Sequence, residues 1–247
     1  YGERVIAISE HIKRHILANY KISEDKIRLV HRCVNTEKFS PEAVTPERMI
    51  NTVRDYNIPD DKKVLLLGGR ITRWKGQHLL IEALSKVKNQ NYYCIIAGDE
   101  QGREEYVKEL KGLIAKYGLE NRVAIFGKVL DMPALMMVSN VILSTAIEPE
   151  AFGRIAIEAM GKIVVASNHG GSLDSVIDGK TGRLFYNNNA ASLAEAIDWA
   201  LSLSESEEEK IAKAAVKNVK DNFTKEIMCA KTIKVYEELM ASDKPND

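Results

Sequence analysis

The sequence lacks the features that would assign it to a membrane-spanning or nucleic-acid-binding class. Its 247 residues carry 35 basic and 35 acidic side chains, so the formal net charge is zero and no basic surface is expected to attract nucleic acid. No apolar run approaches the ~18 residues that a membrane-spanning helix needs. The charged fraction of 28% and the hydrophobic fraction of 45% are typical of a soluble globular chain with one large domain or two small ones.

Cysteine is scarce as well, and its positions suggest neither a bridge nor a metal site. Cys33, Cys94 and Cys229 are odd in number, widely separated and without the spacing of metal ligands. This pattern predicts unpaired thiols in a reducing cytoplasm, with Cys94 in the core because it lies within an apolar run. The chain opens without a signal peptide or an initiator methionine, and we expect it to be a fragment of a longer protein.

Short apolar runs alternate with amphipathic helical stretches along the chain. Runs of Val, Ile and Leu that do not alternate with polar residues are typical of strands covered on both faces. The sequence therefore predicts an α/β fold, with a Rossmann-like parallel sheet and helices on both faces. The predicted strands span residues 64–67, 92–97, 123–126, 141–143 and 163–166. Before them, an earlier piece contains strand 5–9, helix 10–19, strand 27–31 and an extended linker.

Two glutamates mark the most informative segment, VILSTAIEPEAFGRIAIEAM, in which seven residues separate Glu150 from Glu158. Phe152 and Gly153 lie where a following helix exposes free backbone N–H groups, so we expect an anion there. One carboxylate would accept hydrogen bonds from sugar hydroxyls and the other from a ribose, with a diphosphate between them. The alternative is that Glu150 only complements the helix dipole and Glu158 is solvated. The two catalytic carboxylates of a glycosidase stand roughly 5 to 9.5 Å apart, and Glu150 and Glu158 would reach that separation only if this loop folded back.

In open α/β sheets, ligands bind beyond the carboxyl ends of the strands. The predicted strands are followed by the loops GGRITRWKGQ, AGDEQG, GKVLDMP, TAIEPEAFG and SNHGGS. Arg70 and Lys75 in the first loop offer a guanidinium fork and an ammonium group to a diphosphate, and His169 offers a donor to a phosphate or a sugar hydroxyl. Each of the three is also consistent with a solvated surface residue.

These loops, with the stretch SNHGGSLDSVIDGKTGRLF and a closing helix that contains VYEELM, resemble the family 4 retaining glycosyltransferases of the GT-B fold. The resemblance covers nearly the whole chain and makes it the C-terminal half of such a fold. It implies that residues 1–44 are the end of an N-terminal acceptor domain with the interdomain linker. Residues 45–222 would form the nucleotide-sugar donor-binding domain. Residues 223–247 would be a C-terminal helix and tail that pack back towards the N-terminal domain.

The resemblance also implies roles for particular residues. Arg70 and Lys75 would bind the donor diphosphate, Glu150 would contact hydroxyls of the transferred sugar, and Glu158 would hold the ribose. Glu150, Arg70 and Lys75 are the catalytic candidates, because cations near the diphosphate offset the charge of the leaving group. Val129 and neighbouring backbone would cradle the base. The implied donor-binding residues are Gly69, Arg70, Lys75, Gly127, Lys128, Val129, Glu150, Phe152, Gly153, Arg154, Ile155 and Glu158.

Two positions depart from the family pattern. Family members place about two more residues between Met160 and Gly161, and removing two residues would rotate the end of a helix by about 200° relative to the next strand. Either the helix that carries Glu158 ends early or residues are missing at this junction. The second departure is Asp174, where the family has the longer side chain of glutamate.

The resulting prediction is a hexosyltransferase that uses a UDP-, GDP- or ADP-sugar, needs neither a metal nor a cofactor, and acts on a glycan or lipid-linked acceptor in cell-envelope polysaccharide or lipopolysaccharide synthesis. We expect a cytoplasmic protein and no transfer by this chain alone. The basic stretch HIKRHILANYK offers a peripheral contact to the inner face of the membrane, and a solvated helix face is the alternative that its pattern favours. The alternatives are a phosphorylase, a nucleotide-sugar epimerase whose ionisable groups would be His169 or residues of the missing half, and a non-catalytic nucleotide-binding module. A phosphorylase would need a lysine that binds a pyridoxal cofactor, and no motif in the sequence indicates such a lysine.

Overall fold

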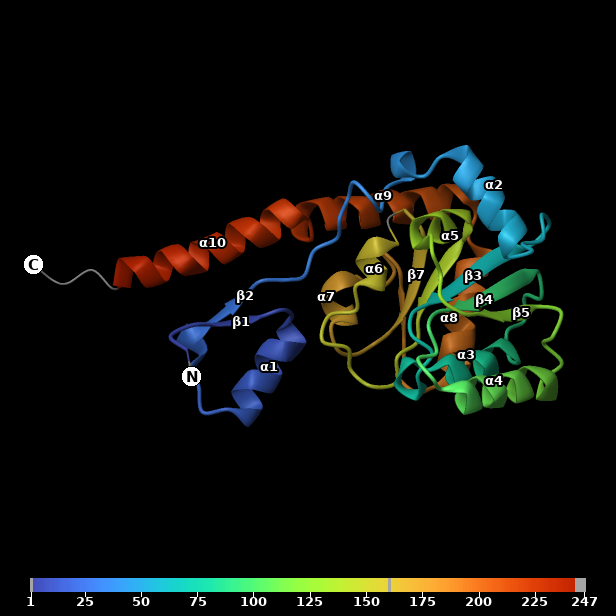
Figure 1. Ribbon diagram of the computed structural model, residues 1–247, viewed down its shortest axis with the longest axis horizontal. Coiled ribbons are helices and arrows are strands. Elements are labelled where there is room, and N and C mark those ends of the chain that lie inside the picture. The colour runs from blue at the N-terminus through green and yellow to red at the C-terminus, as the bar shows by residue number, and fades with distance from the viewer. Residues whose placement is uncertain (1, 160, 243–247) are drawn as a thin grey trace, which may run out of the picture.

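A parallel sheet of six strands forms the centre of the protein (Figure 1). In this computed structural model, which describes residues 2–159 and 161–242, the strand order is β5-β4-β3-β6-β7-β8. The strands are β3 (Lys63–Gly68), β4 (Tyr92–Ala97), β5 (Val123–Phe126), β6 (Val141–Ser144), β7 (Ile163–Ser167) and β8 (Arg183–Phe185). The predicted α/β fold and its five strands are confirmed. β8 escaped prediction because its three residues form no apolar run.

Helices cover both faces of the sheet, which explains why the strands are apolar without alternation. One face packs against α3 (Gln77–Leu84), α4 (Glu104–Lys116) and α8 (Ala190–Ser202), and its core includes Leu65 and Leu84. The other face, which includes Leu66 and Leu135, packs against α5 (Met132–Val138) and the end of α2 (Pro46–Asp55). Neighbouring positions in β3 therefore enter different cores, as the period of a strand requires.

The strand order reverses at β3, and such a reversal marks the edge at which open α/β sheets bind ligands. β3 pairs with β4 on one side and with β6 on the other, and all pairs are parallel. The chain therefore moves outward in both directions from the boundary between β3 and β6. Loops that leave the carboxyl ends of these two strands diverge there, which creates the crevice in which open α/β sheets bind ligands.

The earlier piece lies beside the sheet domain and contains a small parallel pair, β1 (Val5–Ala7) and β2 (Ile27–Leu29), joined by α1 (Glu10–Asn19). The predicted strand 5–9 ends early because Ser9 caps α1, its hydroxyl accepting a hydrogen bond from the N–H of Ile12. Short 3-10 turns occur at Glu24–Lys26, Pro41–Ala43 and Arg73–Lys75.

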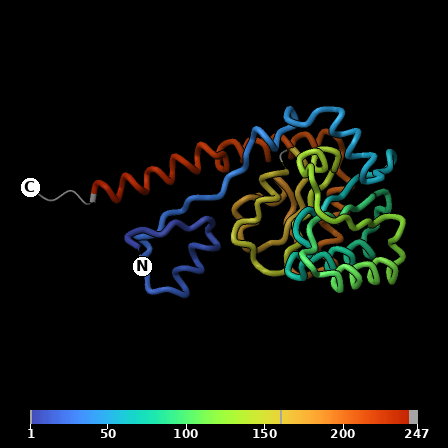
Figure 2. Tube along the Cα trace, viewed as in Figure 1, coloured from blue at the N-terminus to red at the C-terminus, as the bar shows by residue number. Residues whose placement is uncertain are grey.

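Two long helices close the chain, α9 (Glu205–Asn222) and α10 (Lys225–Ser242). α10 extends away from the sheet and runs above β1 and β2 (Figures 1 and 2). Arg28 of β2 forms an ion pair with Glu238 of α10, with 2.7 Å between Nε and Oε2. The linker is also fastened, since the N–H of Val34 donates to the carbonyl of Phe223 at 2.9 Å. The start of the described chain and its last helix therefore meet at this small sheet.

Asp174 of the short helix α7 (Ser172–Ser175) joins the earlier piece to the sheet domain. Its Oδ2 accepts a hydrogen bond from the N–H of Glu10 at 2.7 Å and lies 3.0 Å from Nε2 of His31. Burial raises the pKa of Asp174, but these hydrogen bonds outweigh it and hold that pKa below its ordinary value. The shorter side chain noted in the sequence thus has a specific contact at the start of α1.

The described residues settle some expectations made from composition. Cys94 is buried in the core, as predicted, Cys33 is half-buried and Cys229 is exposed, and all three are free thiols. Across residues 2–159 and 161–242, no helix combines the length and the hydrophobicity needed to cross a bilayer. Met160, at which the family pattern is shortened, lies outside the described residues.

We predict that Gly98→Ala destabilises the fold by about 1–3 kcal/mol, the usual cost of overpacking. A methyl group at this position would stand 1.8 Å from the carbonyl oxygen of Gly69, where the loops after β3 and β4 touch. Urea unfolding measures the effect. Gly112→Ala in α4 is the control, because no atom lies within 4 Å of its added methyl group and alanine favours a helix by about 0.5–1 kcal/mol. Equal or greater stability of Gly98→Ala would contradict the prediction.

Candidate functional site

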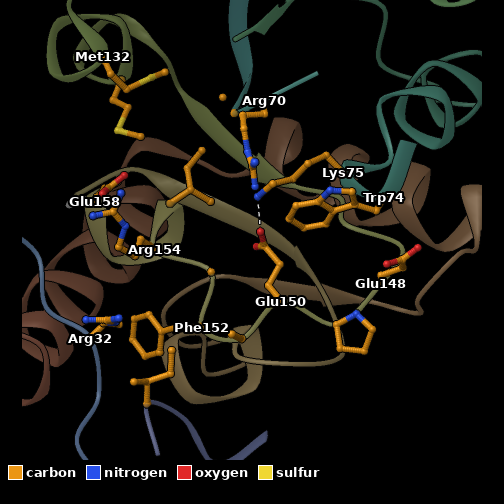
Figure 3. Close-up of a pocket in the computed structure, with 18 residues that line it drawn as sticks. Arg32, Arg70, Trp74, Lys75, Met132, Glu148, Glu150, Phe152, Arg154 and Glu158 are labelled. Atoms are coloured by element: carbon orange, nitrogen blue, oxygen red, sulfur yellow. Dashed lines mark hydrogen bonds and ion pairs between the residues drawn. The ribbon is translucent and has the colours of Figure 1, made fainter. Parts of the chain in front are cut away.

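A pocket of about 670 Å³ opens at the carboxyl ends of β3 and β6 (Figure 3). Its walls come from the loop after β3, the loop after β6, helix α6 (Ile155–Glu158) and the segment that precedes residue 44. It is lined by Ile8, Arg32, Gly68, Gly69, Arg70, Trp74, Lys75, Met132, Met136, Glu148, Pro149, Glu150, Ala151, Phe152, Gly153, Arg154, Ile155 and Glu158. Three carboxylates and four cationic side chains thus share an apolar-backed cleft.

The loop after β3 delivers two cations and an aromatic ring. Trp74 lies within the 3-10 turn, with its ring centroid 4.7 Å from Nζ of Lys75 and 5.9 Å from the guanidinium carbon of Arg70. An aromatic face attracts both charges and holds them on the same side of the pocket. Sequence analysis assigned no role to Trp74, although an aromatic residue between two cations was visible in RITRWKG.

Hydrogen bonds tie this turn to the loop that follows β6. The hydroxyl of Thr145 donates to the carbonyl of Lys75 at 3.0 Å, and the N–H of Ile147 donates to the carbonyl of Trp74 at 2.8 Å. Gly76 permits this approach, since it has φ +73° and an added methyl group would stand 2.0 Å from the carbonyl oxygen of Thr145. Two loops that are far apart in sequence therefore form one wall.

The docked loops bring Lys75 and Glu150 into an ion pair. Both are largely withdrawn from solvent, with side-chain exposures of 21% for Lys75 and 10% for Glu150. Within the described part of the chain, Oε2 of Glu150 is buried without a hydrogen-bond partner. A buried carboxylate oxygen without a partner is costly, so this atom is available to a hydroxyl donor from a ligand.

The turn at residues 150–153 is supported from behind by the glycine pair after β7. The N–H of Gly171 donates to the carbonyl of Glu150 at 2.8 Å, and a methyl group at Gly171 would stand 2.2 Å from Cα of Phe152. Gly153 has φ +74°, a conformation that a side chain would strain. This close packing fixes the backbone that faces the pocket.

Glu158 stands at another side of the pocket, on α6. This helix has only one turn, so the predicted helix is present but short. A helix of this length contributes free backbone N–H groups to the pocket rather than a large dipole. The side chain of Glu158 is 16% exposed and lies 3.6 Å from Nε of Arg154. Burial raises the pKa of Glu158, while the charges of Arg154, Lys38 and Lys75 oppose this effect. Glu158 is thus not the solvated side chain of the alternative interpretation.

The structure brings together most of the residues named from sequence, and it separates some of them. Gly69, Arg70, Lys75, Glu150, Phe152, Gly153, Arg154, Ile155 and Glu158 all line the pocket, whereas Gly127, Lys128 and Val129 do not. Val129 instead packs against the core beside Met132, which does line the pocket. His169 is also outside the lining, and its Nε2 donates to the carbonyl of Ala146 at 2.8 Å.

Comparison with known proteins agrees with the fold and the motifs. The family model for glycosyl transferases group 1 matches residues 50–218. The chain belongs to this family. The predicted resemblance to family 4 glycosyltransferases is therefore confirmed, and the chain spans about three fifths of the length of the curated relatives that it matches.

Solved structures of the family superpose closely. A glycosyltransferase from Rickettsia africae is 39% identical, with a TM-score of 0.93 over 96% of this chain and 64% of that one. Anabaena HepE, solved in complex with UDP-glucose, is 28% identical, with a TM-score of 0.85 over 98% of this chain and 64% of that one. The C-terminal domain of a Francisella tularensis glycosyl transferase group 1 family protein is 25% identical, with a TM-score of 0.66 over 78% of this chain and 99% of that one.

We predict that Glu158 gives stability a specific pH dependence. Its pKa is raised above the ordinary value of 4.5, so the folded state holds this proton more tightly than the unfolded state. The contribution of Glu158 to the free energy of unfolding is fully present below pH 4.5 and is lost as the pH rises through the raised pKa. Urea unfolding of the wild type and of Glu158→Gln at pH 4 and pH 7 measures it. The wild type should lose stability relative to the variant at pH 7, and an unchanged difference would contradict the prediction.

Proposed function

We propose that this chain binds the donor in a retaining glycosyltransferase that moves a hexose from a nucleotide diphosphate to a glycan or lipid-linked acceptor. The observation that carries the proposal is the convergence of Arg70, Lys75 and Glu150 on the fixed turn at Gly153. Cations and free backbone N–H groups favour a diphosphate, and a buried carboxylate favours sugar hydroxyls. The arrangement therefore suits both ends of an activated sugar.

Each group has a distinct role in this proposal. Arg70 and Lys75 bind the diphosphate and offset the negative charge that develops as the glycosidic bond breaks. The unpartnered oxygen of Glu150 accepts a hydroxyl of the sugar, and Glu158 accepts the hydroxyls of the ribose. The base lies towards Val129 and Met132. We assign no covalent nucleophile and no metal to the reaction.

The proposal also covers the setting of the reaction. The product is a cell-envelope polysaccharide or lipopolysaccharide, and transfer takes place in the cytoplasm against the inner face of the membrane. Transfer also needs an acceptor and a wall that excludes water, which residues outside this chain supply. The epimerase alternative drew its ionisable groups from His169 or from residues outside this chain, and His169 lies outside the pocket lining with its Nε2 bonded to the carbonyl of Ala146.

We predict that Arg70→Ala and Lys75→Ala each weaken nucleoside diphosphate binding by about 1.5–3 kcal/mol, the contribution of a charge-assisted hydrogen bond. Thermal unfolding with UDP, GDP and ADP measures binding, because a ligand of the folded state raises the midpoint. One base should give the largest rise. Arg54→Ala on α2 is the control, since Arg54 is exposed and outside the pocket. Unchanged binding by both pocket variants, or no response to any nucleotide, would refute the proposed function.

The two glutamates should separate in their effects on different ligands. We predict that Glu158→Ala weakens binding of the free nucleotide and of the nucleotide sugar alike, because both contain the ribose. Glu150→Ala should weaken binding of the nucleotide sugar alone, and it also frees Lys75 for the diphosphate. Calorimetric titration with the matched pair of ligands tests this. Equal losses for both ligands in Glu150→Ala would contradict the assignment.

A further inference from the structure

Two of the arginines that line the pocket have no counter-charge in the described part of the chain. Arg154 pairs with Glu158, whereas Arg32 and Arg70 form no ion pair and no side-chain hydrogen bond within residues 2–159 and 161–242. Elsewhere most arginines have a partner, as in the pairs of Arg48 with Asp131 and of Arg73 with Glu109. An unpaired guanidinium in a pocket is suited to bind an anionic ligand. Arg70 has such a ligand in the donor diphosphate, and Arg32 has none assigned.

The backbone at Arg32 is fixed on both sides, so the residue is not part of a loose linker. His31 lies 3.0 Å from the carboxylate of Asp174, and its ring packs against Phe152 and Phe223 with centroids 5.9 and 5.4 Å apart. Val34 is buried and donates its N–H to the carbonyl of Phe223. The linker therefore presents Arg32 at a defined place on the pocket rim.

Arg32 does not belong to the group of cations assigned to the diphosphate. Figure 3 shows Arg32 beside Phe152, on the opposite side of Phe152 from Arg70 and Lys75. With Ile8, it forms the part of the pocket wall that comes from the segment preceding residue 44. An anion bound there would lie across Phe152 from the two cations assigned to the donor diphosphate.

We propose that Arg32 binds an anionic group, a phosphate or a carboxylate, on the acceptor of the transferred sugar. This inference rests on the proposed function, because it places the acceptor on the side of the pocket that faces away from the donor cations. Arg32 would select acceptors that carry a negative charge near the reacting hydroxyl. It would bind this charge without taking Arg70 or Lys75 away from the donor diphosphate. The substrate class is then an anionic glycan or an anionic lipid-linked sugar.

The experiment uses inorganic phosphate and acetate as probes on the chain saturated with the best-binding nucleoside diphosphate, at constant ionic strength. Binding is followed by NMR of the arginine side-chain N–H signals, with the Arg32 signal identified by its loss in Arg32→Ala. A saturable shift of that signal by phosphate or acetate, but not by chloride, is expected. Arg32→Ala should bind the effective probe about three- to fivefold more weakly, the range for an exposed charge pair. Arg32→Lys should restore part of the affinity.

Controls separate this site from the donor site. Arg54→Ala, an exposed arginine outside the pocket, should bind the probe as the wild type does. A preference for phosphate identifies a phosphorylated acceptor, and a preference for acetate identifies a carboxylated one. Equal probe binding by the wild type and Arg32→Ala, or loss of all probe binding once nucleotide saturates the chain, would overturn the inference. Either result leaves the donor assignment intact, because nucleotide binding and its loss in Arg70→Ala are measured separately.

Discussion

The ion pair between Lys75 and Glu150 is the contact on which the pocket depends. It joins a loop after the first strand of the sheet to a loop after the fourth, and both loops are held by backbone hydrogen bonds and by glycines that admit no side chain. The close approach of Gly76 to Thr145 brings the loop of the ammonium group against the loop of the carboxylate. The strand order makes this meeting feasible, because β3 and β6 are neighbours although the two charged groups are 75 positions apart in the chain.

The same pair shows how a pocket remains ordered before its ligand arrives. Lys75 and Glu150 are both largely buried, and leaving either one alone would place an uncompensated charge in a poorly hydrated site. In the proposed complex the diphosphate and the sugar hydroxyls supply new partners, so each residue exchanges part of one contact for another. Trp74 keeps the ammonium group near its place during this exchange. Preorganisation of this kind reduces the reorganisation that binding requires.

Local sequence predicted a large part of this structure. Unbroken apolar runs identified five strands, and the residues that follow strands identified the edge at which the pocket opens, because parallel strands align their carboxyl ends. Other features depend on tertiary contacts that a sequence pattern does not encode. The burial of Glu158, the hydrogen bond of His169 to Ala146 and the place of Arg32 on the pocket rim arise from segments that meet only in the folded chain. β8 was missed because its three residues are defined by pairing with β7.

The chain passes between the sheet domain and the small β1–β2 pair twice, once near Val34 and again near Thr224. A parallel bridge joins these two residues, so the two crossings are fastened at one place. Two separated tethers would permit the parts to shear past each other, whereas joined tethers oppose such shear. The contacts of Asp174 with Glu10 and His31 fasten the two parts at a further place. Because Arg32 lies two residues from the bridge and next to His31, both fastenings hold its backbone at the rim of the pocket.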